Sequence, residues 1–452
     1  MKRLFGTDGI RGTAGRPPLD RPTVRRFGIA LAETLTRSDG HTPKVALGRD
    51  TRESGPWIRD AITGGLADRG ATATDAGVVT TPALAHATRT AGFDAGVMIS
   101  ASHNPFEDNG IKVFSREGTK LPDRLEREIE AHILDGDLPD GDCTPATDGS
   151  LLERYLEALE RLAPDRDRIG ARKLLIDCSN GSAVSAAPGL FRESGATFDI
   201  IGAEPDGRNI NLDCGSTHME PLRARVVEGG YDLGIAFDGD ADRCLAVDAR
   251  GTLVDGDHIL YLGARHLDRH GHLPGRKVVA TIMSNFWLER RLAEEGITLL
   301  RAPVGDKYVL ERMTEEGAAL GGEQSGHVIF REHATTGDGL LTALMLLHAI
   351  AEEDRPLEDI MAGIVPSPQV LVNVRVSTKP DLRTHPVIGP AVADAESRLE
   401  GTGRVVLRYS GTETLARVMI EGDDADRVRS EAESLATLIG RELGERPDSA
   451  SK

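Results

Sequence analysis

A serine stands directly after an apolar run near residue 100. Residues 96–99 (Gly-Val-Met-Ile) predict a short buried strand, and the chain turns polar at Ser100, Ser102, His103 and Asn104. A serine hydroxyl is a weak nucleophile that a neighbouring base usually activates. We expect the side chains of Ser102 and His103 to point apart, as neighbours in an extended turn do, and the loop lacks the G-x-S-x-G elbow of serine hydrolases. Helix capping by Ser102 or Asn104 is an equally good interpretation.

Three aspartates occupy alternate positions after a second apolar run. Asp238, Asp240 and Asp242 follow residues 233–237, which predict another buried strand. Three carboxylates on one side of a loop repel one another, and oxygen ligands of this kind favour Mg²⁺ or Ca²⁺. A solvated acidic turn is the alternative. Beside a metal, Ser102 fits the role of a phosphoryl carrier better than that of a hydrolytic nucleophile.

Two further polar loops have compositions that suit a sugar phosphate. Carboxylate and hydroxyl groups in one glycine-flanked loop can bind sugar hydroxyls, and its residues are Glu323, Ser325 and His327. The other loop combines guanidinium groups with hydroxyls and a glycine backbone, which suits a phosphate, and its residues are Arg408, Ser410, Gly411, Thr412 and Arg417. An ordinary turn and a polar hairpin are the respective alternatives. Four histidines without ligand-like spacing are interpreted as structural: His218, His258, His333 and His348.

These loops follow a repeated order of expected elements. Three apolar strands are expected, which begin near Lys44, Lys173 and Lys277. Each is followed by a helix that stops before a glycine, and these helices are expected over residues 57–69, up to residue 194 and up to residue 295. Each unit then has a second apolar run and a strand that leads into one of the polar loops. This alternation predicts mainly parallel sheets, whose strands bind ligands at their carboxyl ends. We therefore expect three similar α/β domains around a central cleft.

The last stretch predicts a smaller α+β domain. Strands are expected at residues 370–377, 404–408 and 416–421, with helices at 387–399 and 424–443. We divide the chain into domains at residues 1–150 with the serine loop, 151–256 with the metal loop, 257–368 with the sugar loop and 369–452 with the phosphate loop. A chain of 452 residues is too long for one core.

Composition limits the classes of function. The net charge of −18 disfavours nonspecific nucleic-acid binding, and no run of eighteen apolar residues predicts a membrane span. The first residues lack the apolar segment of a signal peptide. Four scattered cysteines, without a C-x-x-C pair, argue against a cysteine zinc cluster or a disulfide framework: Cys143, Cys178, Cys214 and Cys244. We expect a cytoplasmic protein.

In this order, the loops resemble those of the α-D-phosphohexomutases. The resemblance covers the whole chain and is carried by FGTDGIRG (5–12), ISASHNP (99–105), DGDADR (238–243), PVGDKY (303–308), GGEQSGH (321–327) and RYSGTE (408–413). The first motif, GGEQSGH and SGTE are most similar to the branch that acts on glucosamine phosphates. An enzyme of the same superfamily acting on glucose or mannose phosphates is the alternative. A noncatalytic sugar-phosphate sensor and a Mg²⁺-dependent phosphatase are less favoured.

The resemblance implies an isomerase that interconverts glucosamine 6-phosphate and glucosamine 1-phosphate, in the biosynthesis of UDP-N-acetylglucosamine. It implies phosphoserine at Ser102, a bisphosphate intermediate, and Mg²⁺ held by the phosphoserine and the three aspartates. Glu323 and Ser325 would hold sugar hydroxyls, and the loop at Arg408 would hold the phosphate that is not transferred.

The resemblance also assigns charged groups to the transferring phosphoryl group. Lys112, Arg11 and Arg243 would stabilise it. Lys112 and His327 are the candidates that could take the proton of the sugar hydroxyl. The resemblance further suggests a homodimer that binds a hexosamine phosphate and Mg²⁺, and the composition predicts neither nucleic-acid nor membrane partners.

Overall fold

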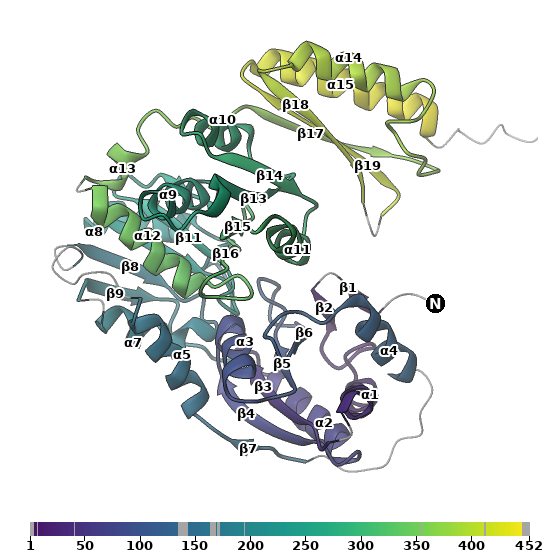
Figure 1. Cartoon of the computed structure of the whole chain (residues 1–452), viewed down its shortest axis with the longest axis vertical. Helices are drawn as coiled ribbons and strands as arrows, with labels where there is room; N and C mark the ends of the chain where they lie inside the picture. Colours follow the sequence, from purple (N-terminus) through teal and green to yellow (C-terminus); the bar gives the residue numbers. More distant parts are fainter. Residues whose placement is uncertain are drawn as a thin grey trace, which may run out of the picture. The chain divides into compact units, whose positions relative to one another are not determined.

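The structure is a computed structural model that describes residues 4–6, 8–39, 41–133, 143–162, 169, 172–193, 195–353, 355–410 and 413–444. The chain forms two compact units (Figure 1). The first consists of Met1–Thr281 with Ile297–Ala362, and the second of Ile282–Gly296 with Gly363–Lys452. Among the described residues, three β-sheets lie in the first unit and one lies in the second. No helix of the described ranges is long and apolar enough to cross a membrane.

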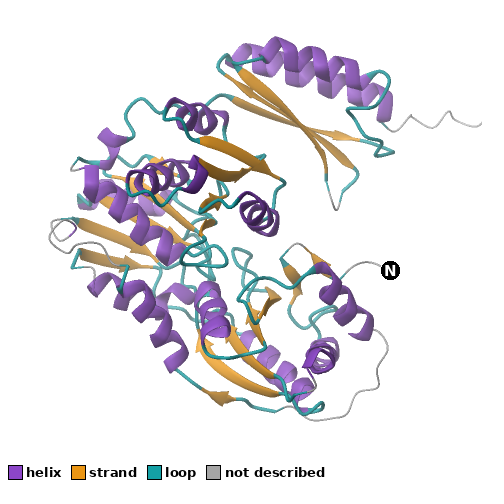
Figure 2. Cartoon of the chain, viewed as in Figure 1, coloured by secondary structure: helices purple, strands orange, loops and turns teal. Residues whose placement is uncertain are grey.

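The first sheet has seven strands in the order β1-β2-β6-β5-β3-β4-β7. The strands are β1 Phe5–Gly6, β2 Gly9–Thr13, β3 Lys44–Arg49, β4 Thr72–Val78, β5 Ala95–Ile99, β6 Asp108–Ser115 and β7 Ala146–Thr147. Pairs from β5 to β7 are parallel, whereas β1, β2, β6 and β5 pair antiparallel. The helices are α1 Arg21–Asp39, α2 Gly55–Ala67, α3 Thr81–Thr90 and α4 Asp123–Ile133 (Figure 2). Strand β5 is buried along its whole length, so its carboxyl end delivers the serine loop from a fixed position.

The second sheet has the order β12-β11-β10-β8-β9. Its strands are β8 Lys173–Asp177, β9 Thr197–Ile201, β10 Leu233–Phe237, β11 Cys244–Asp248 and β12 Leu253–Val254. The associated helices are α5 Ser150–Glu160, η1 Ser182–Ser185, α7 Ala187–Glu193 and α8 Glu220–Gly229. Strands β10 and β11 are buried along their whole length and pair antiparallel, and the tight connection between them carries the three aspartates.

The third sheet has the order β14-β13-β15-β16. Its strands are β13 Lys277–Thr281, β14 Thr298–Ala302, β15 Leu320–Gly322 and β16 Val328–Phe330. Its helices are α9 Gly256–Arg269, η2 Pro274–Arg276, α11 Asp306–Glu316, α12 Gly339–Glu353 and α13 Leu357–Ile360. Helix α12 packs against α9, and most of its residues are buried because its sequence is apolar on nearly every face.

The second unit contains a three-stranded antiparallel sheet in the order β17-β19-β18. Its elements are α10 Phe286–Glu294, β17 Gln369–Arg375, α14 Ile388–Leu399, β18 Gly403–Tyr409, β19 Leu415–Gly422 and α15 Ala425–Leu443. The core of this sheet and its two long helices is made of aliphatic residues such as Val392, Val418 and Ile439.

The expected α/β class is confirmed, with one qualification on the sheets. Each of the three larger sheets has a parallel centre and antiparallel strands on one side, so the sheets are mixed. The antiparallel strands arise because each polar loop is short and returns the chain beside the strand it has just left. The helix expected to run to 194 is divided into η1 and α7, with Ala186 out of helical conformation between them. The four-domain division stays a prediction.

Candidate active site

Strand β5 ends in a loop that buries Ser102. The residue is 1% exposed and has a φ of 53°, which is uncommon for a residue other than glycine. Its Oγ donates to Asp238 Oδ2 over 2.5 Å, and its backbone N–H donates to Ser100 Oγ over 2.9 Å. His103 Nδ1 lies 3.2 Å from Ser102 Oγ, so the expectation that these side chains point apart is wrong. The left-handed backbone at Ser102 turns both side chains to the same side.

Two buried residues that the sequence did not indicate hold this loop. Arg52 is 1% exposed, and its Nη2 donates to the carbonyl oxygens of Ser102 over 3.0 Å and Asn104 over 2.8 Å. Its Nε donates to Asp50 Oδ2, which also accepts a hydrogen bond from Ser100 Oγ. The only sequence signal was an Asp-x-Arg run directly after β3. These bonds fix both backbone and side chains of the serine loop.

The three aspartates converge beside the serine, as the sequence predicted. Oxygens of Asp238, Asp240 and Asp242 lie within 4.8 Å of one another, and all three side chains are buried. A Cβ on Gly239 would lie 2.5 Å from the carbonyl oxygen of Ser102, so only glycine permits the two loops to approach this closely. Burial, followed by repulsion from Asp242 and Asp240, raises the pKa of Asp238 to about 8.

This group of carboxylates fits a hard divalent cation. Asp240 Oδ1 is buried and has no hydrogen-bond partner within the described parts of the chain. A buried carboxylate oxygen without a partner is costly, and three such carboxylates repel one another. Oxygen donors on a short loop are the ligands that Mg²⁺ prefers, and such sites leave positions for phosphate oxygens.

Lys112 on β6 supplies a positive charge at the same place. Its Nζ lies 2.7 Å from Asp240 Oδ2 and 3.3 Å from Asp242 Oδ2. Although burial lowers the pKa of Lys112, these two carboxylates raise it above its ordinary value. Thr81, at the start of α3, also donates to Asp240 Oδ2 over 2.6 Å. In this arrangement Lys112 is a charged donor, and Thr81 is a further contact that the sequence did not indicate.

The predicted arginines lie at the edge of the aspartate group. Arg243 Nε is 4.0 Å from Asp238 Oδ2 and 3.9 Å from Asp242 Oδ1. Arg11, on β2, pairs with Asp8, three residues earlier in the chain. Neither the Arg243 nor the Arg11 Nε has a hydrogen-bond partner within the described part of the molecule, although both atoms are buried. Both guanidinium groups therefore keep donor capacity for an anion.

The loop after β15 places the predicted sugar-binding groups together. Ser325 Oγ donates to Glu323 Oε2 over 3.3 Å, and Glu323 Oε1 accepts the N–H of Gly305 over 3.0 Å. His327 is buried, with Nδ1 3.6 Å from Asp242 Oδ1 and Nε2 accepting the N–H of Gly337 over 3.0 Å. His327 thus joins the sugar loop to the aspartate group.

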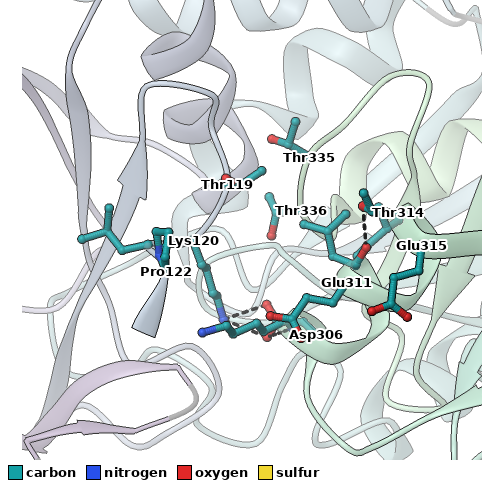
Figure 3. A pocket seen from close by; sticks show the side chains of 13 residues that line it. Thr119, Lys120, Pro122, Asp306, Glu311, Thr314, Glu315, Thr335 and Thr336 are labelled. Atoms are coloured by element: carbon teal, nitrogen blue, oxygen red, sulfur yellow. Dashed lines mark hydrogen bonds and ion pairs between the residues drawn. The ribbon is translucent and has the colours of Figure 1, made fainter. Parts of the chain in front are cut away.

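A cavity of about 400 Å³ borders this region (Figure 3). It lies between α11 and the segment after β6, and Lys120, Asp306, Leu310 and Thr336 are among its lining residues. Lys120 Nζ bonds Asp306 over 2.7 Å and also Asp8 over 2.6 Å. The sequence did not indicate Lys120, which ties the turn between β1 and β2 to the start of α11.

The predicted phosphate loop lies in the second unit. Arg408 on β18 and Arg417 on β19 are directly opposite in the sheet. Burial, followed by repulsion from Arg417, lowers the pKa of Arg408. Like charges opposite one another destabilise a sheet, so this pair favours an anion between or above the guanidinium groups. Ser410 Oγ accepts the N–H of Glu413 over 3.2 Å, and the predicted ligands Gly411 and Thr412 lie outside the described residues.

Comparison with known proteins accounts for nearly the whole chain. Residues 2–140, 153–251 and 255–367 match the families described as phosphoglucomutase/phosphomannomutase, alpha/beta/alpha domains I, II and III, in that order. Residues 371–438 match the C-terminal domain of the same proteins. The chain belongs to the phosphohexomutase family.

Curated members of the phosphohexomutase family resemble this chain over its full length. A phosphoglucosamine mutase of Solibacter usitatus is 48% identical over 447 residues, which cover 98% of this chain and 100% of that protein. A phosphoglucosamine mutase of Granulibacter bethesdensis is also 48% identical, with 97% of each chain covered. The resemblance to the phosphohexomutases seen in the sequence is thereby confirmed.

Solved structures of phosphohexomutases share the fold. A phosphoglucomutase/phosphomannomutase family protein of Burkholderia thailandensis superposes with a TM-score of 0.78 at 23% identity, covering 98% of both chains. The N-acetylphosphoglucosamine mutase of Aspergillus fumigatus, solved in complex with GlcNAc-6P and magnesium, gives 0.66 at 18% identity, with 96% of this chain and 95% of that chain covered.

Proposed function

We infer that the chain catalyses the phosphoglucosamine mutase reaction, the interconversion of glucosamine 6-phosphate and glucosamine 1-phosphate. Its relatives at 45–48% identity over the full length carry that name, which places it with the isomerases. One structural observation carries the inference. The buried hydroxyl of Ser102 lies 2.5 Å from Asp238, in a group of three carboxylates that needs a cation. A sugar-phosphate sensor would need neither group.

The aspartate group is proposed to hold Mg²⁺. Asp238, Asp240 and Asp242 would be its protein ligands, together with a phosphate oxygen on Ser102. When bound, Mg²⁺ neutralises phosphate oxygens and so lowers the cost of bringing two phosphorylated groups together. The partnerless Oδ1 of Asp240 and the high pKa of Asp238 support a divalent cation at this place.

Phosphoserine at Ser102 is the proposed carrier of the phosphoryl group. The free hydroxyl oxygen of glucosamine 6-phosphate forms a bond to phosphorus as the Ser102 Oγ–P bond breaks. This step gives glucosamine 1,6-bisphosphate and a serine hydroxyl. The bisphosphate then turns over, and Ser102 Oγ forms a bond to the phosphorus of the 6-phosphate as the sugar O6–P bond breaks. This step restores phosphoserine and releases glucosamine 1-phosphate. Atoms balance over the cycle, and the structure describes the hydroxyl form of Ser102, hydrogen-bonded to Asp238.

The surrounding residues have proposed roles that follow from their contacts. Arg11, Arg243 and Lys112 would stabilise the charge on the transferring group, since two of them have buried nitrogen atoms without a hydrogen-bond partner in the described structure and the third is a buried cation. Glu323 and Ser325 would bind sugar hydroxyls. The phosphate that is not transferred would bind Arg408, Ser410, Gly411, Thr412 and Arg417.

The proton acceptor for the sugar hydroxyl is proposed from the same two candidates, Lys112 and His327. Lys112 donates to Asp240 and Asp242 in this structure, so it would have to lose a proton before it could accept one. His327 accepts the N–H of Gly337 at Nε2, which leaves the Nδ1 proton facing Asp242. Both residues would therefore change hydrogen bonds during the reaction.

Domain division, oligomeric state and location are proposed as well. The division at residues 150, 256 and 368 gives each predicted loop a domain of its own. A homodimer is proposed from the family resemblance, and light scattering coupled to size-exclusion chromatography would test it. A cytoplasmic location is proposed because all four cysteines are free thiols. The acidic charge supports the proposal that the chain has no nucleic-acid partner.

Replacement of the carrier serine tests the proposed function. The variant Ser102→Ala should lose measurable mutase turnover while its thermal unfolding stays close to that of the wild type. Intact-mass spectrometry should show one phosphate on active wild-type protein and none on the variant. The matched control is Ser115→Ala, whose half-buried hydroxyl bonds to the nearby Glu117 and Thr119, and it should keep full activity. Substantial turnover by Ser102→Ala would refute the carrier role.

Comparison of substrates tests the specificity. The ratio kcat/KM should be highest for glucosamine 6-phosphate among the 6-phosphates of glucosamine, glucose and mannose. A preference for glucose or mannose 6-phosphate would identify a different phosphohexomutase with the same chemistry. Tight binding of these compounds without turnover by phosphorylated wild-type protein would instead identify a sensor.

A further inference from the structure

Histidines gather around one cavity away from the serine loop. The cavity has a volume of about 370 Å³ and lies beside the ends of α9 and α12. Five of the thirteen histidines of the chain line it, namely His266, His270, His272, His333 and His348. The proposed mutase reaction uses none of these residues. A concentration of imidazoles at one place is typical of sites for transition metals, for which imidazole is the commonest protein ligand.

Two of these histidines converge on one glutamate. His266 Nδ1 lies 3.0 Å from Glu352 Oε2, and His270 Nε2 lies 2.5 Å from Glu352 Oε1. Single ligand atoms from the three residues lie within 4.8 Å of one another. His266, in the last turn of α9, and His270, its C-cap residue, are four positions apart and both contact Glu352 of α12. Helix α12 lies beside α9 (Figure 1).

The arginines near Glu352 have another carboxylate as a partner, so Glu352 can bind a cation. Arg269 Nη1 is 3.3 Å from Glu352 Oε2, but its Nη2 makes the shorter contact, 2.7 Å, to Glu353. The Arg269 side chain is half-exposed and can keep Glu353 as its partner. Arg265 also pairs with Glu353, over 3.2 Å. Glu352 can therefore give up a guanidinium contact without leaving an arginine unpaired.

His348 adds a further nitrogen atom that could donate a lone pair to a metal ion in this cavity. Its Nε2 lies 2.7 Å from the carbonyl oxygen of Leu162, which can only accept a hydrogen bond, so the neutral ring carries its proton on Nε2. Its ring centroid lies 5.6 Å from that of His266. In the neutral ring the Nδ1 atom carries a lone pair, so His348 is a further nitrogen donor beside His266.

We propose that His266, His270 and Glu352 bind a transition-metal ion of the Zn²⁺ class. Two imidazole nitrogens and a carboxylate form a common three-residue ligand set for zinc, and a fourth position would face the cavity. The chemistry differs from that of the aspartate group, because nitrogen donors select Zn²⁺, Co²⁺ or Ni²⁺ over Mg²⁺. The ion would join the end of α9 to the end of α12 and stabilise this part of the first unit.

Metal titration of the whole chain tests the site. Co²⁺ in a four-coordinate site with nitrogen donors absorbs visible light strongly, whereas octahedral Co²⁺ with oxygen donors absorbs weakly. Titration in excess Mg²⁺ should therefore give an intense visible spectrum, and one equivalent of Zn²⁺ should abolish it. The experiment is repeated with Asp240→Asn, which impairs the aspartate group but should leave this spectrum unchanged.

Variants of the ligands assign the signal to this cavity. His270→Ala removes a half-exposed ligand, so it should fold normally, lose the intense Co²⁺ spectrum and bind Zn²⁺ at least about a hundredfold more weakly. Zn²⁺ should raise the Tm of the wild type but not that of His270→Ala. The control is His41→Ala, which removes an exposed histidine paired with Asp94 over 2.9 Å and should change neither result.

Outcomes of two kinds would overturn the proposal. The first is a weak, octahedral Co²⁺ spectrum in the wild type, which would mean that the group is only a hydrogen-bonded cluster. The second is Zn²⁺ affinity and stoichiometry that are equal in the wild type and in both His270→Ala and Glu352→Gln. Mutase activity is not the readout, so failure of the proposed function would not affect this test.

Discussion

The guanidinium group of Arg52 holds the backbone of Ser102, with Nη2 donating to the Ser102 carbonyl oxygen over 3.0 Å. The same group bonds the carbonyl oxygens of Asn104 and Asp108, and its Nε pairs with Asp50. A planar guanidinium can serve all of these acceptors at once, and an ammonium cannot. The left-handed conformation of Ser102 depends on such support, since that backbone is costly for a serine.

Replacement Arg52→Lys should therefore lower kcat more than it changes KM. A misplacement of a reacting group by about 1 Å can cost on the order of a hundredfold in rate, and we expect a loss of roughly ten- to a hundredfold. Steady-state kinetics and intact-mass spectrometry of the phosphoserine would measure it. The control is Arg25→Lys. Arg25 is also a buried arginine, but it pairs with Asp68 and not with the serine loop. An equal kcat loss in both variants would mean that Arg52 acts only through stability.

A second prediction concerns Mg²⁺ binding by the aspartate group, Asp238, Asp240 and Asp242. Asp240→Asn keeps the size of the side chain but removes one of the two carboxylates that Lys112 contacts most closely. The Mg²⁺ concentration for half-maximal activity should rise, and kcat should fall at saturating Mg²⁺. The matched control is Asp359→Asn, which removes an exposed carboxylate paired with Arg250. A Mg²⁺ titration of Asp240→Asn that superposes on that of the wild type would exclude this aspartate as a ligand.

The positions of these groups show what the sequence could and could not predict. The aspartates and Ser102 were predictable because each follows an apolar strand directly, and polar residues at strand ends gather at one edge of a sheet. Arg52, Thr81 and Lys120 were not, because their partners lie 50 to 186 residues away in the chain. Pairing of β3 with β5 in the first sheet brings Arg52 to Ser102, and packing of different sheets brings Thr81 to Asp240 and Lys120 to Asp306.

Local conformation explains the other difference from expectation. The expected separation of Ser102 and His103 assumed an extended turn, but a φ of 53° at Ser102 brings the hydroxyl within 3.2 Å of the imidazole. The Ser102 N–H donates to Ser100 Oγ, and Arg52 and Asn211 donate to the Ser102 carbonyl oxygen. Together these hydrogen bonds outweigh the local backbone preference. Propensity at one residue cannot report contacts from elements far along the chain.

A third prediction concerns the dependence of stability on pH. Asp338 precedes α12 and is buried, and its Oδ1 accepts bonds from Tyr155 Oη over 2.8 Å and the N–H of Leu341 over 3.0 Å. Burial raises the pKa of Asp338 from 3.8 to about 6. The folded state therefore holds this proton more tightly than the unfolded state. The stabilising contribution is complete below about pH 4 and is lost as the pH rises through 6.

The loss should reach about 3 kcal/mol, the free energy of roughly two pKa units. Asp338→Asn keeps an oxygen acceptor for Tyr155 and Leu341 but cannot ionise. The difference between the Tm of Asp338→Asn and that of the wild type should therefore be more positive at pH 7.5 than at pH 5. Scanning calorimetry at both pH values would measure the change, with Asp359→Asn as the exposed control. A Tm difference independent of pH would contradict the assigned pKa.

The last prediction separates recognition of the phosphate from its transfer. The loop at Arg408 is proposed to hold the 6-phosphate in one half-reaction and the 1-phosphate in the other. Arg408→Ala should therefore reduce kcat/KM in both directions. A charge-assisted hydrogen bond contributes roughly 1.5–3 kcal/mol, which corresponds to a loss of about ten- to a hundredfold. Arg417 is directly opposite in the sheet, so its removal should have a similar effect.

A surface arginine supplies the control for this experiment. Arg398→Ala breaks an exposed ion pair with Glu431, on the helices that cover the same sheet, and should leave the kinetics unchanged. Mg²⁺ dependence should be unaffected in Arg408→Ala, because the aspartates lie in the other compact unit. Steady-state kinetics with glucosamine 6-phosphate and with glucosamine 1-phosphate would decide. A defect confined to one substrate would contradict a shared phosphate site, because the same guanidinium must then serve only one of the two orientations.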